Sequence, residues 1–533
     1  MEDPPPSSSS SSTKARGSND SNTSIGGLNL LNDDLVQNIL ARLPAPSFAS
    51  AACVTKSWSF ICNRILFRPK LSTALSLNPL LHDAVNEVVN KVLSDPIRPH
   101  FAIVNVGSGF ELSKTLQLIR GRLGFNIPII VSVANGIIGS DAVTDEFKEV
   151  KWGVLFSGFS GDGYTRNINE GIVLTVGYLP GLKVEAIPLV RPSKASQARY
   201  IDDFVMDINE YSASVSIRPF PVAVILIGEA SSDMKPVMEK LDYAMPKDTV
   251  IVGDERGCFI YRSGNDSRNA CGRRGDIEAV ALVFAEDRDR ISGKIKFHVA
   301  LSNGVSAVGA KYKTASVRTS STDSSTWLTA RREGQQEHLD GQTILHDIHE
   351  LLENHIESPD LYIGVIKHRK FSIGVEKPMP RTCIAYHGVV GGDEEYLYVD
   401  GIGIRTGDIF QFYRSDPNSA SASLTKVHDS LRNIKLEGNS KTSKTDVDNN
   451  VDVFGGFIFA CYGRGESFFG HVNVDSSPFL ENFPGVPLAG IFCGGEMVRP
   501  CTTFFGECQE GSSISCCLHV YSTVYLVMSY TPL

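Results

Sequence analysis

The stretch that most constrains this chain lies near its N-terminus, at residues 30–67. In its first part an apolar residue recurs about once per helical turn, at Leu31, Leu35, Ile39 and Leu43. This is the spacing of one face of an amphipathic helix. Short helices in so few residues cannot bury a large core by themselves, so a segment of this kind often depends on a partner.

Two residue types set the helix ends in this segment. Pro44 ends the first helix, because the residue before a proline is pushed out of the helical region of backbone space. Ser47 is a good N-cap, so we expect a second helix to begin there. Val54 and Trp58 then continue the apolar stripe. The sequence therefore predicts three short helices before residue 68.

This segment resembles an F-box, the helical module that docks on the Skp-type adaptor of a cullin ubiquitin ligase. The residues that carry the resemblance are Leu31, Asp33, Asp34, Leu35, Ile39, Leu40, Arg42, Leu43, Pro44, Ser47, Phe48, Cys53, Val54, Lys56 and Trp58. Asn32 is a departure, since the family usually has proline there, but asparagine can cap a helix that proline would begin.

The resemblance implies an F-box at residues 25–72 and a Skp-type adaptor, and through it a cullin, as partners. The residues expected to contact the adaptor are Leu31, Leu35, Ile39, Leu43, Pro44, Val54 and Trp58. The alternative is that these apolar residues only complete a domain core, because an apolar stripe is more often core than interface.

Composition is that of an intracellular, soluble protein with several domains. The length of 533 residues favours three or four domains. The net charge of −9 argues against nucleic acid as the main partner. The N-terminus lacks the apolar core of a signal peptide, and the run at 127–138 is shorter than the ~20 residues that span a bilayer. The odd number of cysteines, 11, suits a reducing compartment, the cytoplasm or the nucleus.

The order of predicted elements indicates an α+β or mixed α/β fold, in which mixed sheets are flanked by helices. Residues 1–24 are rich in serine and proline and are expected to be disordered. An amphipathic helix is expected at 80–93. A β-α-β unit follows at 101–133, and a weaker repeat of it at 221–253, which favours parallel strand pairs.

A polar, Ser/Thr-rich stretch at 311–337 shows no periodicity and is expected to be a linker. Beyond it the sequence predicts helices at 341–355 and 420–436 and several glycine-punctuated strands. The stretch at 437–450 is expected to be a mobile polar loop.

Most of the chain after the F-box is similar to the FIST domain, a ligand-sensor-like module that is also found fused to F-boxes. The residues that carry this resemblance are Cys461–Gly465, Phe469, Gly470, Pro484, Val486–Gly490, Phe492, Cys493, Gly495, Glu496, Leu518, His519 and Tyr521, and more weakly Ala134–Gly139. The resemblance implies an N-terminal half at 78–310 and a C-terminal half at 338–530.

The combined resemblance implies a non-catalytic substrate receptor of a cullin ligase, in which FIST chooses the protein target. The alternative is a sensor of a small, amino-acid-like molecule with a signalling role. A leucine-rich repeat would need a period of 20–29 residues, and the sequence shows no such period.

Four residues near two turns are candidates for ligand binding: Arg464, Gly465, Gly495 and Glu496. The glycines permit close backbone approach, and Arg464 could grip a carboxylate. The alternative is a buried ion pair between Arg464 and Glu496 that holds the two turns together.

No cofactor or metal is expected. His349-Glu350 begins like a zinc-protease motif, but Glu353 stands where the second histidine is required. His346 and His349 could share a metal, but a solvated polar face with ordinary i, i+4 contacts is the stronger interpretation. No nucleophile is paired with a base, so the sequence gives no support to an enzyme.

Overall fold

The computed structural model describes residues 32–152, 169–192, 196–265, 269, 276–289, 293–320, 324–352, 360–372, 379–437, 451–499, 514–515 and 518–532. The predicted N-terminal tail, Leu31 and nearly all of the predicted loop at 437–450 lie outside these residues.

Three short helices form the N-terminal module: α1 (Asp33–Leu40), α2 (Ala45–Ala52) and α3 (Lys56–Ile65). They share a small core of Val36, Leu40, Phe48, Ala51, Ile61 and Cys62. The predicted start of the second helix at Ser47 was wrong, because α2 begins directly after Pro44. Its first turn tolerates Pro46, since the N–H groups there have no partner within the helix.

The body of the molecule contains two large sheets. The ten-stranded sheet has the order β1-β6-β2-β3-β9-β8-β10-β7, with β20 beside β9 and β22 beside β20. Its strands are β1 (Lys70–Ser76), β2 (Phe101–Val106), β3 (Ile129–Val133), β6 (Ile172–Tyr178), β7 (Leu182–Val190), β8 (Ala223–Glu229), β9 (Val250–Arg262), β10 (Ile277–Glu286), β20 (Glu496–Val498) and β22 (Leu518–His519).

The six-stranded sheet has the order β11-β23-β18-β19-β4-β5. Its strands are β4 (Gly136–Ser140), β5 (Phe147–Lys151), β11 (Lys294–Ser302), β18 (Asp452–Cys461), β19 (Leu488–Cys493) and β23 (Thr523–Thr531). Parallel and antiparallel pairs occur in both sheets, which confirms the predicted mixed α+β class.

Both predicted β-α-β units are confirmed. Strands β2 and β3 pair in parallel across α5 (Leu112–Leu123), and β8 and β9 pair in parallel across α7 (Lys235–Ala244). The helix expected at 80–93 is α4 (Leu81–Val92). Helix α6 (Gln197–Val215) was not predicted, although Tyr200, Phe204 and Ile208 recur one turn apart on its buried side.

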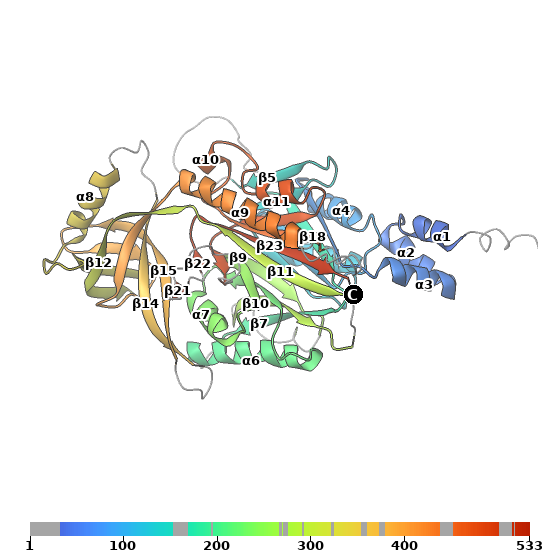
Figure 1. Cartoon of the computed structure of the whole chain (residues 1–533), viewed down its shortest axis with the longest axis horizontal. Helices are drawn as coiled ribbons and strands as arrows, with labels where there is room; N and C mark the ends of the chain where they lie inside the picture. Colours follow the sequence, from blue (N-terminus) through green and yellow to red (C-terminus); the bar gives the residue numbers. More distant parts are fainter. Residues whose placement is uncertain are drawn as a thin grey trace, which may run out of the picture.

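The main core lies between the two sheets. Phe101, Ile225 and Leu282 from the ten-stranded sheet pack in one cluster with Phe459 and Leu526 from the six-stranded sheet. Helices cover the outer faces: α4, α5, α6 and α7 on one side, α9 (Pro417–Glu437) and α11 (Ser477–Asn482) on the other. The body therefore has four layers, and in Figure 1 α6 and α7 lie below the sheets while α9 lies above them.

A closed six-stranded antiparallel barrel is inserted between β11 and α9. Its strands are β12 (Val305–Ser320), β13 (Ser325–Arg332), β14 (Leu361–Phe371), β15 (Met379–Gly392), β16 (Leu397–Asp400) and β17 (Ile409–Ser415). Closure comes from pairing of β14 with both β15 and β17. Helix α8 (Gly341–Leu352) packs its buried side into the barrel core, and β21 (Ile514–Ser515) pairs with β15.

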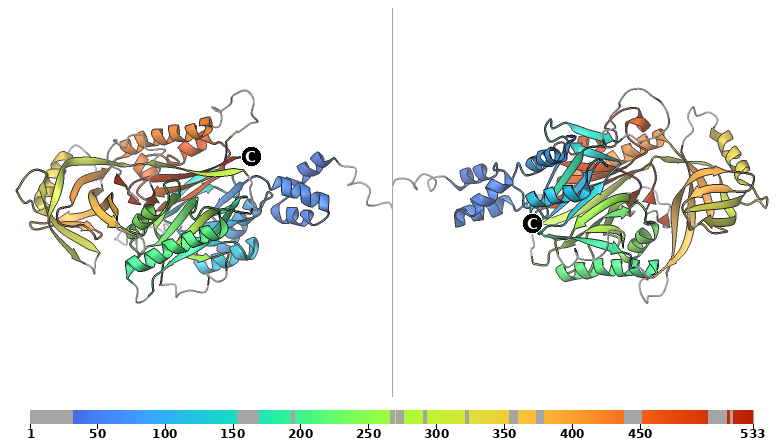
Figure 2. Two further views of the ribbon diagram at one scale, coloured as in Figure 1. Left: turned by 60° about the horizontal axis from the view of Figure 1, so that its bottom comes forward. Right: turned by 180° about the vertical axis from the view of Figure 1, so that it is seen from behind.

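The predicted linker at 311–337 was therefore wrong, since most of this stretch is the β12–β13 hairpin of the barrel. Alternate residues such as Tyr312, Leu328 and Ala330 face the barrel core, while most of the residues between them are polar and face water. Barrel and N-terminal helices lie at opposite ends of the molecule (Figures 1 and 2).

Candidate functional site

The N-terminal helices expose apolar side chains that a self-sufficient domain would bury. Leu35 and Ile39 on α1 are 54% and 52% exposed, Val54 is 61% exposed and Phe60 on α3 is 67% exposed. Val36 and Leu40, which share α1, are buried in the core of the module. Because water-exposed apolar surface is costly, these four side chains are candidates for contact with a partner.

Local capping holds the helices that present these residues. Asn32 Oδ1 accepts a hydrogen bond from the N–H of Asp34 at 3.4 Å, so asparagine does cap α1. Thr55 Oγ1 accepts from the N–H of Trp58 at 3.1 Å and caps α3. Each cap satisfies one N–H group that the helix itself leaves without a partner.

The other predicted contact residues divide between surface and core. Pro44 is exposed. Leu43 and Trp58 are half-buried and pack against the module's own core, so they support the fold as well as offering a partial surface. Leu31 lies outside the described residues. Phe60 was missed, because it falls off the face defined by Trp58 and Ile61.

The module is fixed to the body by its second helix. The N–H of Ala45 donates to the carbonyl oxygen of Leu93 at 2.9 Å, and Ala45 is buried in the cluster beneath α4. Arg68 Nη1 lies 3.5 Å from an Asp452 carboxylate oxygen. The three helices therefore project from one end of the molecule while remaining attached to it (Figure 1).

The second candidate, around Arg464, is a fully buried ion pair. Arg464 Nη2 lies 2.9 Å from Asp475 Oδ1, and neither side chain has exposed surface. Nη1 donates to the carbonyl oxygens of Ser302 and Tyr521 at 3.3 and 3.0 Å. Enclosed in this way, the Arg464 guanidinium has no exposed surface to offer a ligand. The sequence suggested a buried ion pair between Arg464 and Glu496, but the carboxylate that pairs with Arg464 is that of Asp475.

Glu496 is buried on β20 and has partners of its own. Its Oε2 accepts from the N–H and the hydroxyl of Ser522 at 3.2 and 2.8 Å, and the Cys493 thiol donates to Oε1 at 3.5 Å. Burial raises the pKa of Glu496 to about 8, although the hydrogen bonds from Ser522 oppose the shift. This carboxyl group is therefore mostly protonated at neutral pH.

The two candidate glycines have steric roles. Gly465 has a φ of +83°, which side chains other than glycine rarely adopt. A Cβ at Gly495 would lie 2.5 Å from a Glu255 carboxylate oxygen. Arg464 and Glu496 thus have different side-chain partners, although both bond the peptide group between Tyr521 and Ser522.

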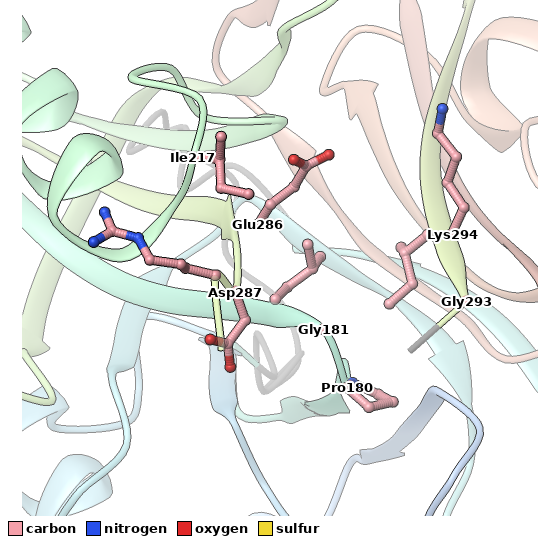
Figure 3. A pocket seen from close by; sticks show the side chains of 10 residues that line it. Pro180, Gly181, Ile217, Glu286, Asp287, Gly293 and Lys294 are labelled. Atoms are coloured by element: carbon pink, nitrogen blue, oxygen red, sulfur yellow. The ribbon is translucent and has the colours of Figure 1, made fainter. Parts of the chain in front are cut away.

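A hollow of about 210 Å³ opens between the turn after β6 and the start of β11, and Figure 3 shows its lining. Two of its charged groups are engaged: Asp287 pairs with Lys183 at 3.2 Å, and Arg288 donates to the carbonyl oxygens of Ala213 and Ser216. Ile217 on its rim is the most exposed large apolar side chain of the described part.

The histidine pattern on α8 has a simple explanation. His346 Nε2 lies 3.1 Å from a Glu350 carboxylate oxygen, an i, i+4 pair on a solvated face. Glu353 lies outside the described residues. No group of three metal-ligating side chains occurs within the part of the chain that the structure describes. Among the same residues, no helix is both long and apolar enough to cross a bilayer.

Comparison with known proteins bears on the N-terminal helices first. The F-box domain family matches residues 28–70, so the three-helix module with its exposed apolar face is an F-box. Along nearly its whole length the chain is similar to the F-box/LRR-repeat protein At5g63520 of Arabidopsis thaliana. The two are 48% identical over 508 residues, 94% of this chain and 93% of that protein. The chain belongs to the same family of F-box proteins.

The name of that relative includes leucine-rich repeats. Such repeats stack one short parallel strand per 20–29 residues. In the described parts of this chain the sheets are mixed or antiparallel and the barrel is closed, so these parts do not contain a repeat stack.

Proposed function

We propose that this chain is the substrate-recognition subunit of a Skp-cullin-F-box ubiquitin ligase. The observation that carries the proposal is that Leu35, Ile39, Val54 and Phe60 are each more than half exposed on a segment that matches the F-box domain. In this role the chain performs no chemistry. It holds a target protein near the conjugating enzyme, so the rate gain comes from proximity.

The energetics of the face suit a protein partner. Fully burying a large apolar side chain is worth about 1.5–3 kcal/mol, and these four residues begin more than half exposed. A stable interface of standard size buries ~800 Å² on each partner. The exposed sides of three short helices and the turns between them are of the right scale for a Skp-type adaptor.

We further propose that the body and barrel form a FIST-like region that binds the target. The four-layer body continues directly from the F-box through β1, and the barrel lies at the far end of the molecule (Figure 2). A target bound at the body or barrel would therefore be held away from the adaptor, as simultaneous binding requires.

The test compares two chemically matched variants of the full chain. Ile39→Asp places a charge on the docking face, whereas Ile217→Asp makes the same change at a side chain that is 84% exposed on the body. We expect Ile39→Asp to reduce affinity for the Skp-type adaptor at least 30-fold, roughly 2 kcal/mol, as at an interface hot spot. Ile217→Asp should bind like the wild type. Equal binding by both variants would refute the proposed docking face.

Leu43→Asp is a poorer test, because Leu43 packs against the F-box core. Loss of binding in that variant could come from unfolding of the module. Ile39 avoids this ambiguity, since its side chain is exposed while its helix neighbour Leu40 supplies the core contact.

A second candidate function is the sensing of a small molecule by the body. It is favoured by a cavity beside the Arg464 turn, whose lining groups are described below. The two functions are compatible, because cavity and docking face use different residues.

A further inference from the structure

A cavity of about 450 Å³ lies between β5, the short helix α10 (Glu466–Phe469) and the end of β19. Its volume falls in the range of small-molecule sites. The residues that line it are Glu149, Val150, Lys151, Trp152, Glu466, Ser467, Val472 and Phe492. They come from two segments more than 300 positions apart in the chain, so the cavity could not be predicted from a sequence motif.

Glu149 provides a buried acceptor without a donor. Its Oε1 accepts from the N–H of Ser476 at 2.8 Å. Its Oε2 is shielded from solvent and has no hydrogen-bond partner. A buried carboxylate oxygen without a partner is costly. Burial, with a smaller contribution from the neighbouring Asp475 carboxylate, raises the pKa of Glu149 to about 7.

The lysine in the lining already makes hydrogen bonds within the protein. Lys151 Nζ donates to the carbonyl oxygen of Arg464 at 2.6 Å and to Ser467 Oγ at 3.3 Å. It also lies 4.7 Å from the ring centre of Tyr462, a cation–π distance. An anion entering the cavity would have to compete with these contacts and would face Glu149 and Glu466.

The remaining lining is largely apolar, and Phe492, Val150 and Val472 provide that surface. Trp152, which is 7% exposed, adds an indole N–H without an acceptor. With two carboxyl groups against one bound lysine, the cavity favours a positive ligand, and the free oxygen of Glu149 requires a donor.

We infer that this cavity binds a small primary amine that carries an apolar group. The ammonium pairs with the Glu149 carboxylate, whose shielded Oε2 must turn toward the cavity to accept the hydrogen bond, and the apolar group packs against Phe492 and Val472. The ligand is therefore positive, whereas a ligand bound by Arg464 would be negative. Arg464 instead forms an ion pair with Asp475. The inference does not depend on the proposed ligase role, since no F-box residue takes part.

The charges around Glu149 also determine how binding depends on pH. Burial and the Asp475 carboxylate disfavour its ionised form, whereas the hydrogen bond from Ser476 and the Arg464 guanidinium favour it. Lys151 and Glu466 are the other charged groups in the cavity lining. An ammonium ion binds the ionised carboxylate. Amine affinity is therefore expected to rise between pH 6 and pH 8 as Glu149 loses its proton.

The experiment is calorimetric titration of the full chain with isoamylamine, benzylamine and tryptamine. Benzyl alcohol and benzoate serve as neutral and anionic partners of benzylamine. We expect at least one amine to bind saturably at pH 8, at least 10-fold more tightly than either partner. Glu149→Gln keeps the acceptor for Ser476 but lowers amine affinity at least 10-fold, as expected for a lost charge-assisted hydrogen bond.

Two further variants keep the result interpretable. Glu146→Gln makes the same change at an exposed position just before β5 and should leave binding unchanged. Val472→Trp fills the cavity mouth at a side chain that tolerates bulk and should abolish binding. The inference is overturned if no amine binds saturably, if benzoate binds as well as benzylamine, or if Glu149→Gln binds like the wild type.

Discussion

Helices α1 and α4 both carry an apolar stripe, but only α4 buries its stripe completely. Val85, Val88 and Val92 of α4 pack on the ten-stranded sheet. In α1 the stripe divides: Leu40 points into the F-box core, while Leu35 and Ile39 remain in water.

The difference comes from the surroundings of each helix. A helix on a wide sheet finds enough surface to cover all its apolar residues, whereas three short helices cannot enclose theirs. An apolar stripe thus predicts that one face of a helix will be covered. The size of the module determines whether its own chain can supply that cover.

The largest expected effect tests the buried side of this comparison. Val88→Asp places an unpaired charge in a site with no exposed surface, and should cost about 3–5 kcal/mol of unfolding free energy. Ile39→Asp should change stability by less than about 0.5 kcal/mol. Urea unfolding of both variants measures this, and similar losses would show that the α1 stripe is also core.

The buried pair of Arg464 and Asp475 should be almost as important to stability. Arg464→Met leaves the Asp475 carboxylate buried without its partner, at an expected cost of about 3 kcal/mol. Arg256→Met removes an arginine that is 54% exposed and should cost less than about 0.5 kcal/mol. An Arg464→Met protein of wild-type stability would indicate that the pair is solvated rather than buried.

The stability of the body should also depend on pH. The pKa of Glu496 is raised by burial to about 8, so the folded state holds a proton that the unfolded state releases near pH 4.5. Stability should therefore fall as pH rises from 5 to 8.5.

Glu496→Gln tests this dependence. The variant should match the wild type at pH 5 and exceed its stability by about 1–3 kcal/mol at pH 8.5, because one pKa unit corresponds to about 1.4 kcal/mol. Some slope should remain, since burial also raises the pKa of Asp254 to about 7. Parallel pH profiles for variant and wild type would contradict a protonated Glu496.

The smallest effect concerns a surface contact on the barrel. His346→Ala removes an exposed i, i+4 contact with Glu350 and should cost about 0.3 kcal/mol. Calorimetry with and without added zinc checks this. A zinc-dependent rise in melting temperature that is lost in the variant would instead favour a metal on α8.

Much of the fold could be predicted where periodicity is strong. The helix α4 and both β-α-β units follow from local pattern, as do α8 and α9. The barrel hairpin could not be recognised, because its outer face is polar and only residues such as Tyr312 and Leu328 mark the inner one. The residue types at 311–337 resemble those of a linker, and the barrel becomes evident only from the pairing of its strands.

The candidate site was predictable only in part. F-box motifs identified Leu35 and Ile39, but spacing could not show which apolar residues of α1 face outward. The partner of Arg464 is Asp475, a loop residue with no motif of its own. Glu149 and Lys151 gained a role only because distant segments of the six-stranded sheet meet beside α10.

The central claim is that the F-box face, and not the body, contacts the adaptor. Hydrogen–deuterium exchange of the full chain, with and without a Skp-type adaptor, tests it most directly. We predict slower exchange in residues 33–65 on binding and no change in α4 or in the barrel at 305–415. Protection of the barrel or of α4, with residues 33–65 unchanged, would contradict the account.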